Sequence, residues 1–422
     1  SALRGRFYNE TTFFRIIPRW SFQIDKDTEV NTSVGFGQNN ITVDLGENYF
    51  KLRSNILSAR GEFNKQITPI WKSYVGFDNQ YNWFDLNLRL PSFSNQGGVG
   101  NPLSTGQTKD VALKDKATLL GLFWRNELKL DHGVTLIPGL RWDAFRTTKE
   151  NLVQPKFAAR YEYDKDLLFR LASGVYYQPP SGQQSNKDFG NPDIKSGRAY
   201  HLNVGLEKDF RQGATEGHTL STGVFVKKLD NLVIASTGAV TRDGVTTTEN
   251  YSNQGTGRIQ GLEATWKLKR DIWSMGLAYT LSQSFRTEPG QKEYYSQYDQ
   301  THNLNILGSY ETSRWLWTSR CRYVSGAPLT PVVGSFYDAD SDGYVPERGE
   351  FYSARKAAFF QVDLRGERKV IYDQWVLSWY FDIQNILNRK NIEGVEYSYN
   401  YSQRTDVMGI GMLPTFGVKG EF

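Results

Sequence analysis

The stretch Trp375–Leu387, W-V-L-S-W-Y-F-D-I-Q-N-I-L, alternates between apolar and polar residues. Every second position from Trp375 to Ile383 is apolar, and Ser, Tyr and Asp lie between them. This period of two is typical of a strand with one apolar and one polar face. The last residues, Thr415–Phe422, repeat the pattern and end on an aromatic ring. Together the two segments predict the closing hairpin of a transmembrane β-barrel.

The composition of the 422 residues fits such a barrel. Mean hydropathy is −0.55, and no run approaches the roughly 18 apolar residues that a membrane helix needs. A barrel needs no such run, because only alternate residues of its strands meet lipid. Aromatic residues make up 14%, as aromatic girdles at the two membrane interfaces would require. Cys321 is the only cysteine, so we expect no intramolecular disulfide and no cysteine-based metal site.

The charge pattern argues against nucleic acid as a partner. The formal net charge is +5 and the sequence pI about 8.9. No stretch gathers enough Lys and Arg to indicate a nucleic-acid surface.

Strand-like segments continue back to the start of the chain, about 17 in all, with boundaries uncertain by a few residues. We therefore predict an all-β fold in which residues 1–422 form an antiparallel transmembrane barrel without a separate plug domain. Short turns, such as Asp164–Asp166, alternate with longer connections. This asymmetry is typical of outer-membrane barrels, whose longer loops lie outside the cell. The loops expected to be extracellular lie near residues 91–114, 178–196, 231–255, 327–355 and 389–408.

Four short motifs resemble those of TonB-dependent outer-membrane receptors, and they occur in that family's order. They are N-P-D-I-K at Asn191–Lys195, D-Q-T-H at Asp299–His302, G-A-P-L-T-P at Gly326–Pro331 and D-I-Q-N-I-L-N at Asp382–Asn388. The terminal Phe422 also fits the family, and the resemblance extends over about residues 180–422.

The resemblance implies a location in the bacterial outer membrane, among lipid and lipopolysaccharide, and energy coupling to TonB. It also implies an N-terminal plug inside a 22-stranded barrel. No segment of this chain reads as the plug, so we expect the chain to be the C-terminal part of such a barrel. An upstream segment or further chains would then complete the wall. Direct pairing of the segments Thr12–Ile24 and Thr415–Phe422 would instead indicate a smaller closed barrel.

Three functions stay open at this point. The resemblance favours an active importer that takes up a scarce metal chelate, cofactor or glycan. A plugless passive or secretory pore, alone or in a multi-chain complex, is the first alternative, and a surface adhesin or structural barrel is the second. Because the chain carries no recognisable catalytic motif, we do not expect an enzyme.

The candidate site residues fall into three groups. Aromatic residues in the long loops could stack against a ligand: Phe189, Phe336, Tyr337, Tyr397, Tyr399 and Tyr401, the last three on one face if that loop is extended. Charged residues on polar strand faces are expected to line the lumen: Glu263, Arg320, Arg322, Asp363, Arg365 and Glu367. Asp338, Asp340 and Asp342 begin a D-x-D-x-D-G sequence that resembles the start of a calcium loop. Position 12 of that loop is Gly349 rather than the usual Glu, so Ca²⁺ is a conditional expectation and no other cofactor is predicted.

Overall fold

The computed structural model describes residues 7–91, 108–186, 190–211, 216–236, 238–242, 244–339 and 343–421. These residues form almost only strands. The single helix among them, α1 (Gly182–Ser185), is one turn long and is capped by the Ser181 hydroxyl. In the described part of the chain, no helix has the length and apolar character needed to cross a membrane.

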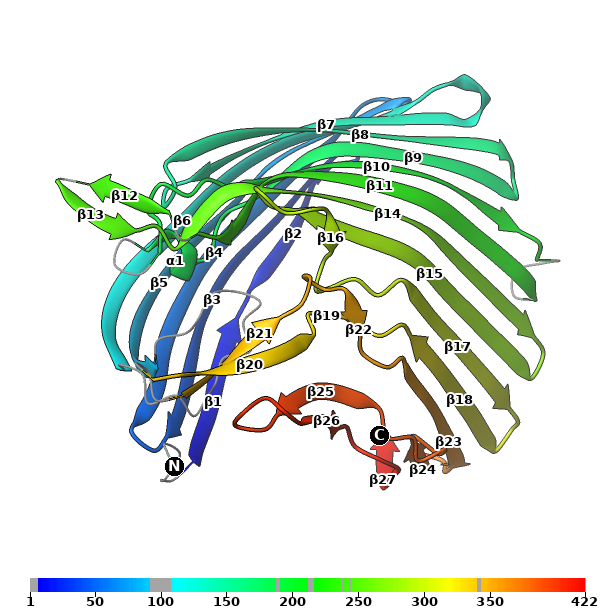
Figure 1. Cartoon of the computed structure of the whole chain (residues 1–422). Coiled ribbons are helices and arrows are strands. Elements are labelled where there is room, and N and C mark those ends of the chain that lie inside the picture. Colours follow the sequence, from blue (N-terminus) through cyan, green and yellow to red (C-terminus); the bar gives the residue numbers. More distant parts are fainter. Residues whose placement is uncertain are drawn as a thin grey trace. The chain divides into compact units, whose positions relative to one another are not determined.

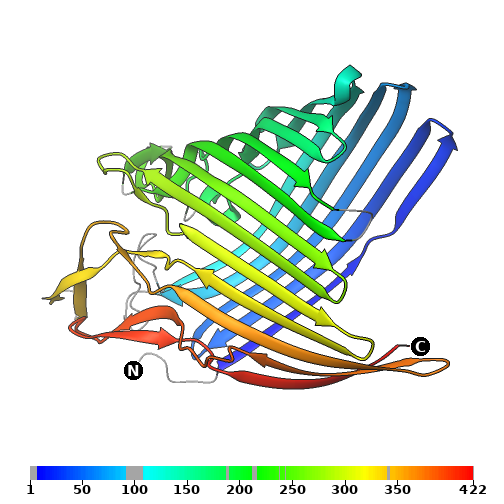
Figure 2. The same cartoon turned by 90° about the vertical axis from the view of Figure 1, so that its right-hand side faces the viewer.

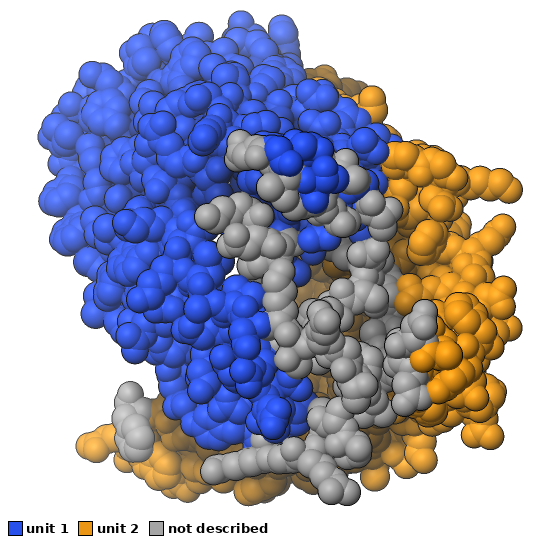
Figure 3. Space-filling model, turned by 60° about the vertical axis from the view of Figure 1, so that its left-hand side comes forward, with its two compact units in different colours: residues 1–159, 172–201, 229–256 blue, residues 160–171, 202–228, 257–422 orange. Residues whose placement is uncertain are grey.

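The chain divides into two compact units, which Figure 3 colours separately. Unit 1 comprises residues 1–159, 172–201 and 229–256, and unit 2 comprises residues 160–171, 202–228 and 257–422. Five strands contain residues of both units: β8 (Glu150–Asp164), β9 (Leu167–Gln178), β10 (Gly197–Asp209), β11 (Gly217–Ala235) and β14 (Tyr251–Arg270).

In unit 1, antiparallel strands follow one another in chain order (Figure 1). They are β1 (Phe7–Ile16), β2 (Arg19–Asp25), β3 (Thr28–Leu45), β4 (Asn48–Thr68), β5 (Trp71–Pro91), β6 (Thr108–Lys129) and β7 (Val134–Phe145). A 3₁₀ turn at Asp131–Gly133 joins the last two. A small hairpin, β12 (Ala239–Arg242) with β13 (Val245–Thr248), stands apart from this ladder.

In unit 2, a second run of antiparallel strands also follows chain order (Figure 2, yellow-green to red). They are β15 (Trp273–Thr287), β16 (Tyr294–Tyr295), β17 (His302–Glu311), β18 (Trp315–Val324), β23 (Phe359–Ile371), β24 (Val376–Gln384) and β27 (Leu413–Glu421). Three small sheets lie in the connections: β19 (Pro328–Leu329) with β22 (Ala354–Arg355), β20 (Val332–Asp338) with β21 (Gly343–Arg348), and β25 (Ile392–Tyr397) with β26 (Arg404–Met408).

In the described ranges, the principal sheet contains 19 strands. The predicted segment Thr12–Ile24 is two of these, β1 and β2, which both pair with β3. The pairing with β3 is interrupted at Pro18, because proline has no N–H to donate to the ladder of backbone hydrogen bonds. Its carbonyl still accepts a hydrogen bond from the Val34 amide at 3.3 Å. With β1 and β2 taken as one interrupted strand and the two-residue β16 left out, the sheet agrees with the predicted number of strands.

Burial is inverted relative to a water-soluble fold. Among the described residues only five hydrophobic side chains are buried, whereas 20 polar or charged residues are. Large hydrophobic side chains stay exposed along the strands; Phe13 and Phe416, for example, are 74% and 67% exposed. Isolated exposed apolar residues are ordinary, but continuous apolar strand faces need a covering, and here lipid would provide it.

Strands extend into a polar stretch of the sequence and into parts of two expected loops. Residues 38–45, which resemble a polar loop, continue β3, and a two-residue turn with Gly46 at φ 62° leads directly into β4. Residues 108–114 of the expected loop 91–114 belong to β6 and pair with β5. The turn at Gly46 also means that long and short connections do not alternate strictly. In the expected loop 231–255, likewise, β11 continues to Ala235 and β14 begins at Tyr251.

The sequence does not identify these residues as strand because the apolar face changes sides along the strands of unit 1. In the first part of β3, Val30–Phe36, the even-numbered residues are mostly apolar, but from Gln38 onward the even-numbered residues are polar. Their odd-numbered neighbours become apolar instead and align across four strands in two rows. One row is Ile41, Leu52, Leu86 and Leu113, and the next is Val43, Phe50, Leu88 and Val111. A strand whose apolar face changes sides loses the simple alternation by which strands are recognised.

Candidate functional site

The family-like motifs form the anchors of the connections between strands. Asp299 of the D-Q-T-H motif is 1% exposed. Its carboxylate accepts hydrogen bonds from the Ser284 amide at 2.8 Å and the Thr301 hydroxyl at 2.9 Å. The Arg355 guanidinium donates to the same carboxylate at 2.6 Å. One buried acid thus ties the end of β15, the start of β17 and the small strand β22 together.

Asn385 of the D-I-Q-N motif has the same role at the end of β24. It is 2% exposed and has a φ of 52°, a left-handed conformation that Asn tolerates. Its backbone N–H donates to the Asp363 carboxylate at 2.9 Å. Its side chain donates to the Arg389 carbonyl at 2.8 Å and to the Ile410 carbonyl at 3.3 Å.

The other two motifs act in a similar way. A Cβ at Gly326 would lie 1.7 Å from the Lys356 carbonyl oxygen, so only glycine fits at this close backbone approach. Asn191, 4% exposed, donates to the Glu249 carboxylate at 2.6 Å and to the Tyr251 carbonyl at 2.8 Å. The motifs therefore explain how the connections are held.

The charged residues expected in the lumen lie on the polar faces of unit 2. Arg320 of β18 opposes Asp363 of β23 in the strand register, and the pair forms a salt bridge at 2.8 Å. Arg365 pairs with Glu367 at 2.8 Å and its guanidinium carbon lies 3.8 Å from the centre of the Tyr380 ring.

Two further lumen candidates occupy comparable positions. Arg322 opposes Gln361, on the same face as the Arg320–Asp363 pair. Glu263 alternates with the apolar residues of β14, and its backbone carbonyl accepts a hydrogen bond from Thr222. Internal ion pairs thus engage four of the six residues predicted to line the lumen.

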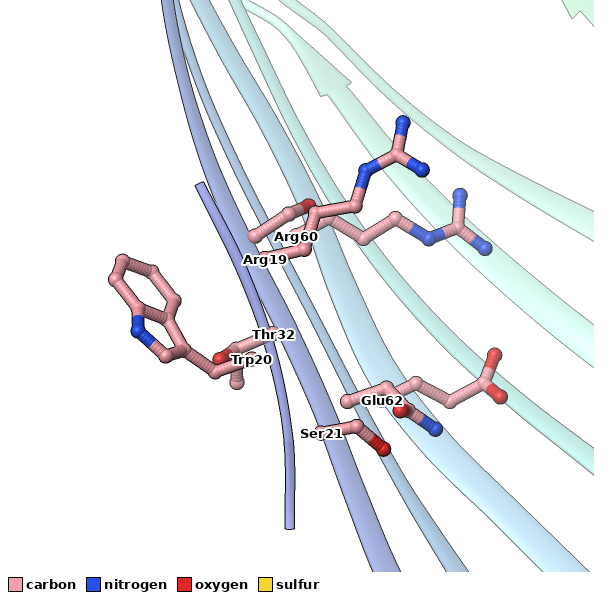
Figure 4. A pocket seen from close by; sticks show the side chains of 8 residues that line it. Arg19, Trp20, Ser21, Thr32, Arg60 and Glu62 are labelled. Atoms are coloured by element: carbon pink, nitrogen blue, oxygen red, sulfur yellow. The ribbon is translucent and has the colours of Figure 1, made fainter. Parts of the chain in front are cut away.

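A shallow recess of ≈ 430 Å³ on the wall of unit 1 shows the same division of faces (Figure 4). Arg19, Ser21, Arg60 and Glu62 point to one side of the strands, whereas Trp20 points to the other. The recess is shallow and is lined by residues of both charges, so we interpret it as part of the polar face of the wall and not as a binding pocket.

The aromatic candidates do not form a single stacking face. Tyr337 contacts Tyr344 across the β20–β21 hairpin at 5.4 Å between ring centroids, and Tyr344 contacts Tyr399 at 5.6 Å. Tyr397 pairs with Tyr401 at 6.0 Å instead. The expectation of three rings on one face is therefore wrong, because the chain turns at residues 398–401 and sends Tyr399 to the neighbouring hairpin.

Other predicted site residues have fewer structural facts. Phe336 is 59% exposed on β20, and Phe189 lies outside the described residues. Asp338 closes the β20–β21 hairpin opposite Gly343, whereas Asp340 and Asp342 also lie outside the described residues. Among the described side chains no group of three His, Cys, Asp or Glu could hold a metal ion. The calcium site stays a prediction.

A more concentrated group, which the sequence did not single out, lies where β15 ends. We call Arg286, Tyr294, Phe351 and Tyr352 the Arg286 cluster. Arg286 and Tyr294 are opposite each other in the register. The Tyr294 ring stacks on Tyr352 and meets Phe351, each at 5.8 Å between ring centroids. The segment F-R-T-E-P-G-Q-K-E-Y-Y contains Arg286 and Tyr294 and has three aromatic residues, but nothing in it points to Phe351 and Tyr352.

The cation of this cluster has neutral partners. The Arg286 guanidinium donates to the Phe285 carbonyl at 2.9 Å and to the Ser284 hydroxyl at 3.3 Å. No described carboxylate lies within ion-pair distance of it. A Cβ on Gly257 would lie 2.9 Å from its nitrogen, so the glycine leaves the room that the guanidinium occupies.

The tyrosines of the cluster stay protonated over a wide pH range. Burial, and then the hydrogen bond to the Glu288 carboxylate, raise the pKa of Tyr294. Burial also raises the pKa of Tyr352. The cluster thus presents neutral phenol groups beside one guanidinium, an arrangement suited to an anion with aromatic or hydroxyl-rich parts.

Comparison with known proteins places this geometry in a family. Residues 3–386 match the family model described as "TonB dependent receptor-like, beta-barrel". No curated protein sequence matches the chain.

Solved structures share the fold at low sequence identity. The pyoverdine outer membrane receptor FpvA from Pseudomonas aeruginosa superposes with a TM-score of 0.71 at 12% identity, over 99% of this chain and 62% of its own. The ferric-catecholate import receptor Fiu from Escherichia coli gives 0.68 at 13% identity, over 98% and 64%. The siderophore receptor PiuA from Acinetobacter baumannii gives 0.66 at 13%, over 98% and 65%.

The chain therefore spans less than two thirds of the length of these receptors. The family match and the shared fold explain the lipid-facing strands as those of a multi-pass barrel in the outer membrane. By the match over residues 3–386, the chain belongs to the TonB-dependent receptor β-barrel family.

Proposed function

We propose that this protein is an active outer-membrane importer that binds an anionic metal chelate at the Arg286 cluster and is coupled to TonB. The family and the solved neighbours, named as transporters or receptors, support import as the class of function. The observation that carries the ligand class is Arg286, a cation without a described acidic partner, flanked by tyrosines that remain neutral.

The chemistry of the cluster favours a chelate over a neutral sugar. A guanidinium in a half-buried position gains most from a negative charge, which replaces the water that it has lost. The rings of Tyr294 and Tyr352 lie next to that charge, and their hydroxyl groups donate to the Glu288 carboxylate and the Gln297 side chain. Metal chelates of carboxylates or catecholates combine negative charge with flat or oxygen-rich surfaces, and so match both features. The role is binding and transport, not catalysis.

Binding by the purified full-length protein would test the ligand class. Ferric tricatecholate and ferric citrate serve as probes, and dextran oligosaccharide serves as the neutral competitor. The substitution Arg286→Ala is expected to weaken chelate binding about tenfold or more, because a charge-assisted hydrogen bond is lost. Arg270→Ala, at the far end of β14, is the matched control and should leave the affinity unchanged. Equal affinity of both variants, or preference for the oligosaccharide, would contradict the proposal.

Uptake by cells would separate active import from a passive pore. In cells that express the full-length protein, a protonophore should abolish accumulation of the labelled chelate, because TonB-coupled transport depends on the proton gradient. Uptake that persists without the gradient, together with steady ion conductance in planar bilayers, would favour the passive or secretory pore instead.

A further inference from the structure

Arg322 differs from the other arginines on the polar face of unit 2. It belongs to β18 and lies on the face opposite the exposed Trp317 and Tyr323. In a barrel this polar face is the inner one. The register partners of Arg322 are neutral, Asn305 of β17 and Gln361 of β23. Among the described residues, no carboxylate lies within ion-pair distance of its guanidinium group.

The acid that follows next on this face is already engaged. Asp363, two positions along β23 from Gln361, forms a salt bridge with Arg320 at 2.8 Å. Its carboxylate also accepts a hydrogen bond from the Gln361 side chain at 2.7 Å. The guanidinium carbon of Arg322 lies beside a ring instead, 5.2 Å from the centre of Phe359. Because the Arg322 side chain is exposed, it can bind an anion without first breaking an ion pair.

The register relates Arg322 to the Arg286 cluster within one sheet. Arg322 opposes Asn305, which in turn opposes Ala278 of β15. Arg286 follows Ala278 by eight positions, an even number, so both lie on the same face. At about 3.4 Å per residue, the two arginines lie at levels about 27 Å apart along the strands, with Arg322 closer to the short turns. A tricatecholate bound at Arg286 therefore does not reach Arg322 at the same time.

The part of β15 between these two levels carries only small side chains on this face. They are Thr280, Ser282 and Ser284, and none is charged. Along β15, β17 and β18, the first cation that follows Arg286 on this face is Arg322. An anion that leaves Arg286 along this wall therefore finds its next positive charge at Arg322.

We propose that Arg322 is a second, transient binding position for the anionic metal chelate, which it takes over from the Arg286 cluster during import. This inference rests on the proposed function. The guanidinium donates charge-assisted hydrogen bonds to carboxylate or catecholate oxygens, and the Phe359 ring beside it contacts a flat part of the ligand. Because Arg322 is exposed to water, it binds more weakly than the half-buried Arg286, as suits a position that the ligand must leave again.

The test separates binding from transport in cells that express the full-length protein, with iron(III) tricatecholate carrying radioactive iron as the probe. Arg322→Gln should lower the uptake rate at saturating chelate about tenfold. The Kd, measured in the presence of a protonophore, should stay within about twofold of the wild type. Arg322→Lys keeps the charge and should restore most of the rate. Lys419→Ala, which removes a cation from the same face near the short turns, should transport like the wild type.

Chelate binding by the purified full-length protein tests Arg322 without transport. Arg286→Ala should retain a weak binding of the chelate, and the double variant Arg286→Ala/Arg322→Gln should lose it. An unchanged Kd in Arg286→Ala would contradict the proposed ligand site instead. In that case, Arg322→Gln alone decides on Arg322 by its effect on the uptake rate.

Three results would overturn the proposal. The first is an equal uptake rate of Arg322→Gln and Lys419→Ala. The second is a rise in Kd for Arg322→Gln as large as that for Arg286→Ala, since this would indicate a single site. The third is a slow uptake that Arg322→Lys does not restore, since this would indicate that Arg322 acts through the structure of the wall and not through its charge.

Discussion

Strands β4, β5 and β6 of unit 1 have 21, 21 and 22 residues, whereas β17, β18, β24 and β27 of unit 2 have 10, 10, 9 and 9. About 9–11 residues cross a bilayer. These four strands of unit 2 are therefore just long enough to cross, and much of the chain between them forms separate small hairpins. Those of unit 1 continue as one sheet well beyond the membrane.

The two units differ in the interactions that hold the segments beyond the membrane. In unit 1 the extension is held by an uninterrupted ladder of backbone hydrogen bonds and by two apolar rows. In unit 2 the hairpins depend on a few buried polar residues, above all Asp299 and Asn385. A ladder is insensitive to single substitutions, whereas a buried polar anchor fails when one partner is lost. This contrast can be tested.

The largest effect is expected from Asp299→Ala. It removes the acceptor of three donors and leaves the Arg355 guanidinium without its buried partner. Breaking a buried ion pair from one side costs about 3–5 kcal/mol. Hydrogen exchange should rise in residues 284–302 and 326–356 while β4 and β5 remain protected. Unchanged exchange in the first two segments would show that Asp299 is not an anchor.

The next effect is expected from Gly326→Ala. The new methyl group would meet the Lys356 carbonyl oxygen at 1.7 Å, so the backbone must move. Forced overpacking of this kind costs about 1–3 kcal/mol, as a change in the free energy of unfolding in urea would show. Gly244→Ala, where nothing lies within 4 Å but φ is +79°, separates backbone strain from steric overlap. A larger loss at Gly244 would contradict the steric explanation.

A smaller effect tests the change of polarity in unit 1. Leu86 lies in an apolar row and Asn87, the next residue, lies on the opposite polar face. Leu86→Asp should cost about 1–3 kcal/mol of unfolding free energy, because a polar group enters an apolar surrounding. Asn87→Asp should stay within about 0.5 kcal/mol of the wild type, as surface substitutions usually do. The reverse order of the two losses would mean that the faces are wrongly assigned.

The smallest effect concerns calcium at residues 338–343. We expect Ca²⁺ to bind weakly, with a Kd of about 10⁻⁴–10⁻³ M as in extracellular modules. Terbium luminescence sensitised by the neighbouring tyrosines would detect the site, and Asp338→Asn should reduce the signal. Asp406→Asn, in the other hairpin, is the control. A signal that is the same in both variants would exclude a site built on Asp338.

The sequence by itself determined the class of the fold and the family. Alternation in Trp375–Leu387 predicted β24, and its register with β27 pairs Phe381 with Phe416 on the apolar face. Such alternation is local, since each strand must present every second residue to lipid. The motifs around Asp299 and Asn385 likewise indicated the family, although their anchoring role appears only in three dimensions.

Tertiary structure decided what depends on register between distant segments. Residues 38–45 resemble a loop, but pairing with β4 makes them strand, because an apolar row is completed only by residues of neighbouring strands. The Arg286 cluster joins Tyr294 and Tyr352, which are 58 positions apart in the sequence. No local pattern specifies such neighbours, since hydrogen-bonded register is set by the sum of many cross-strand contacts and not by any one segment.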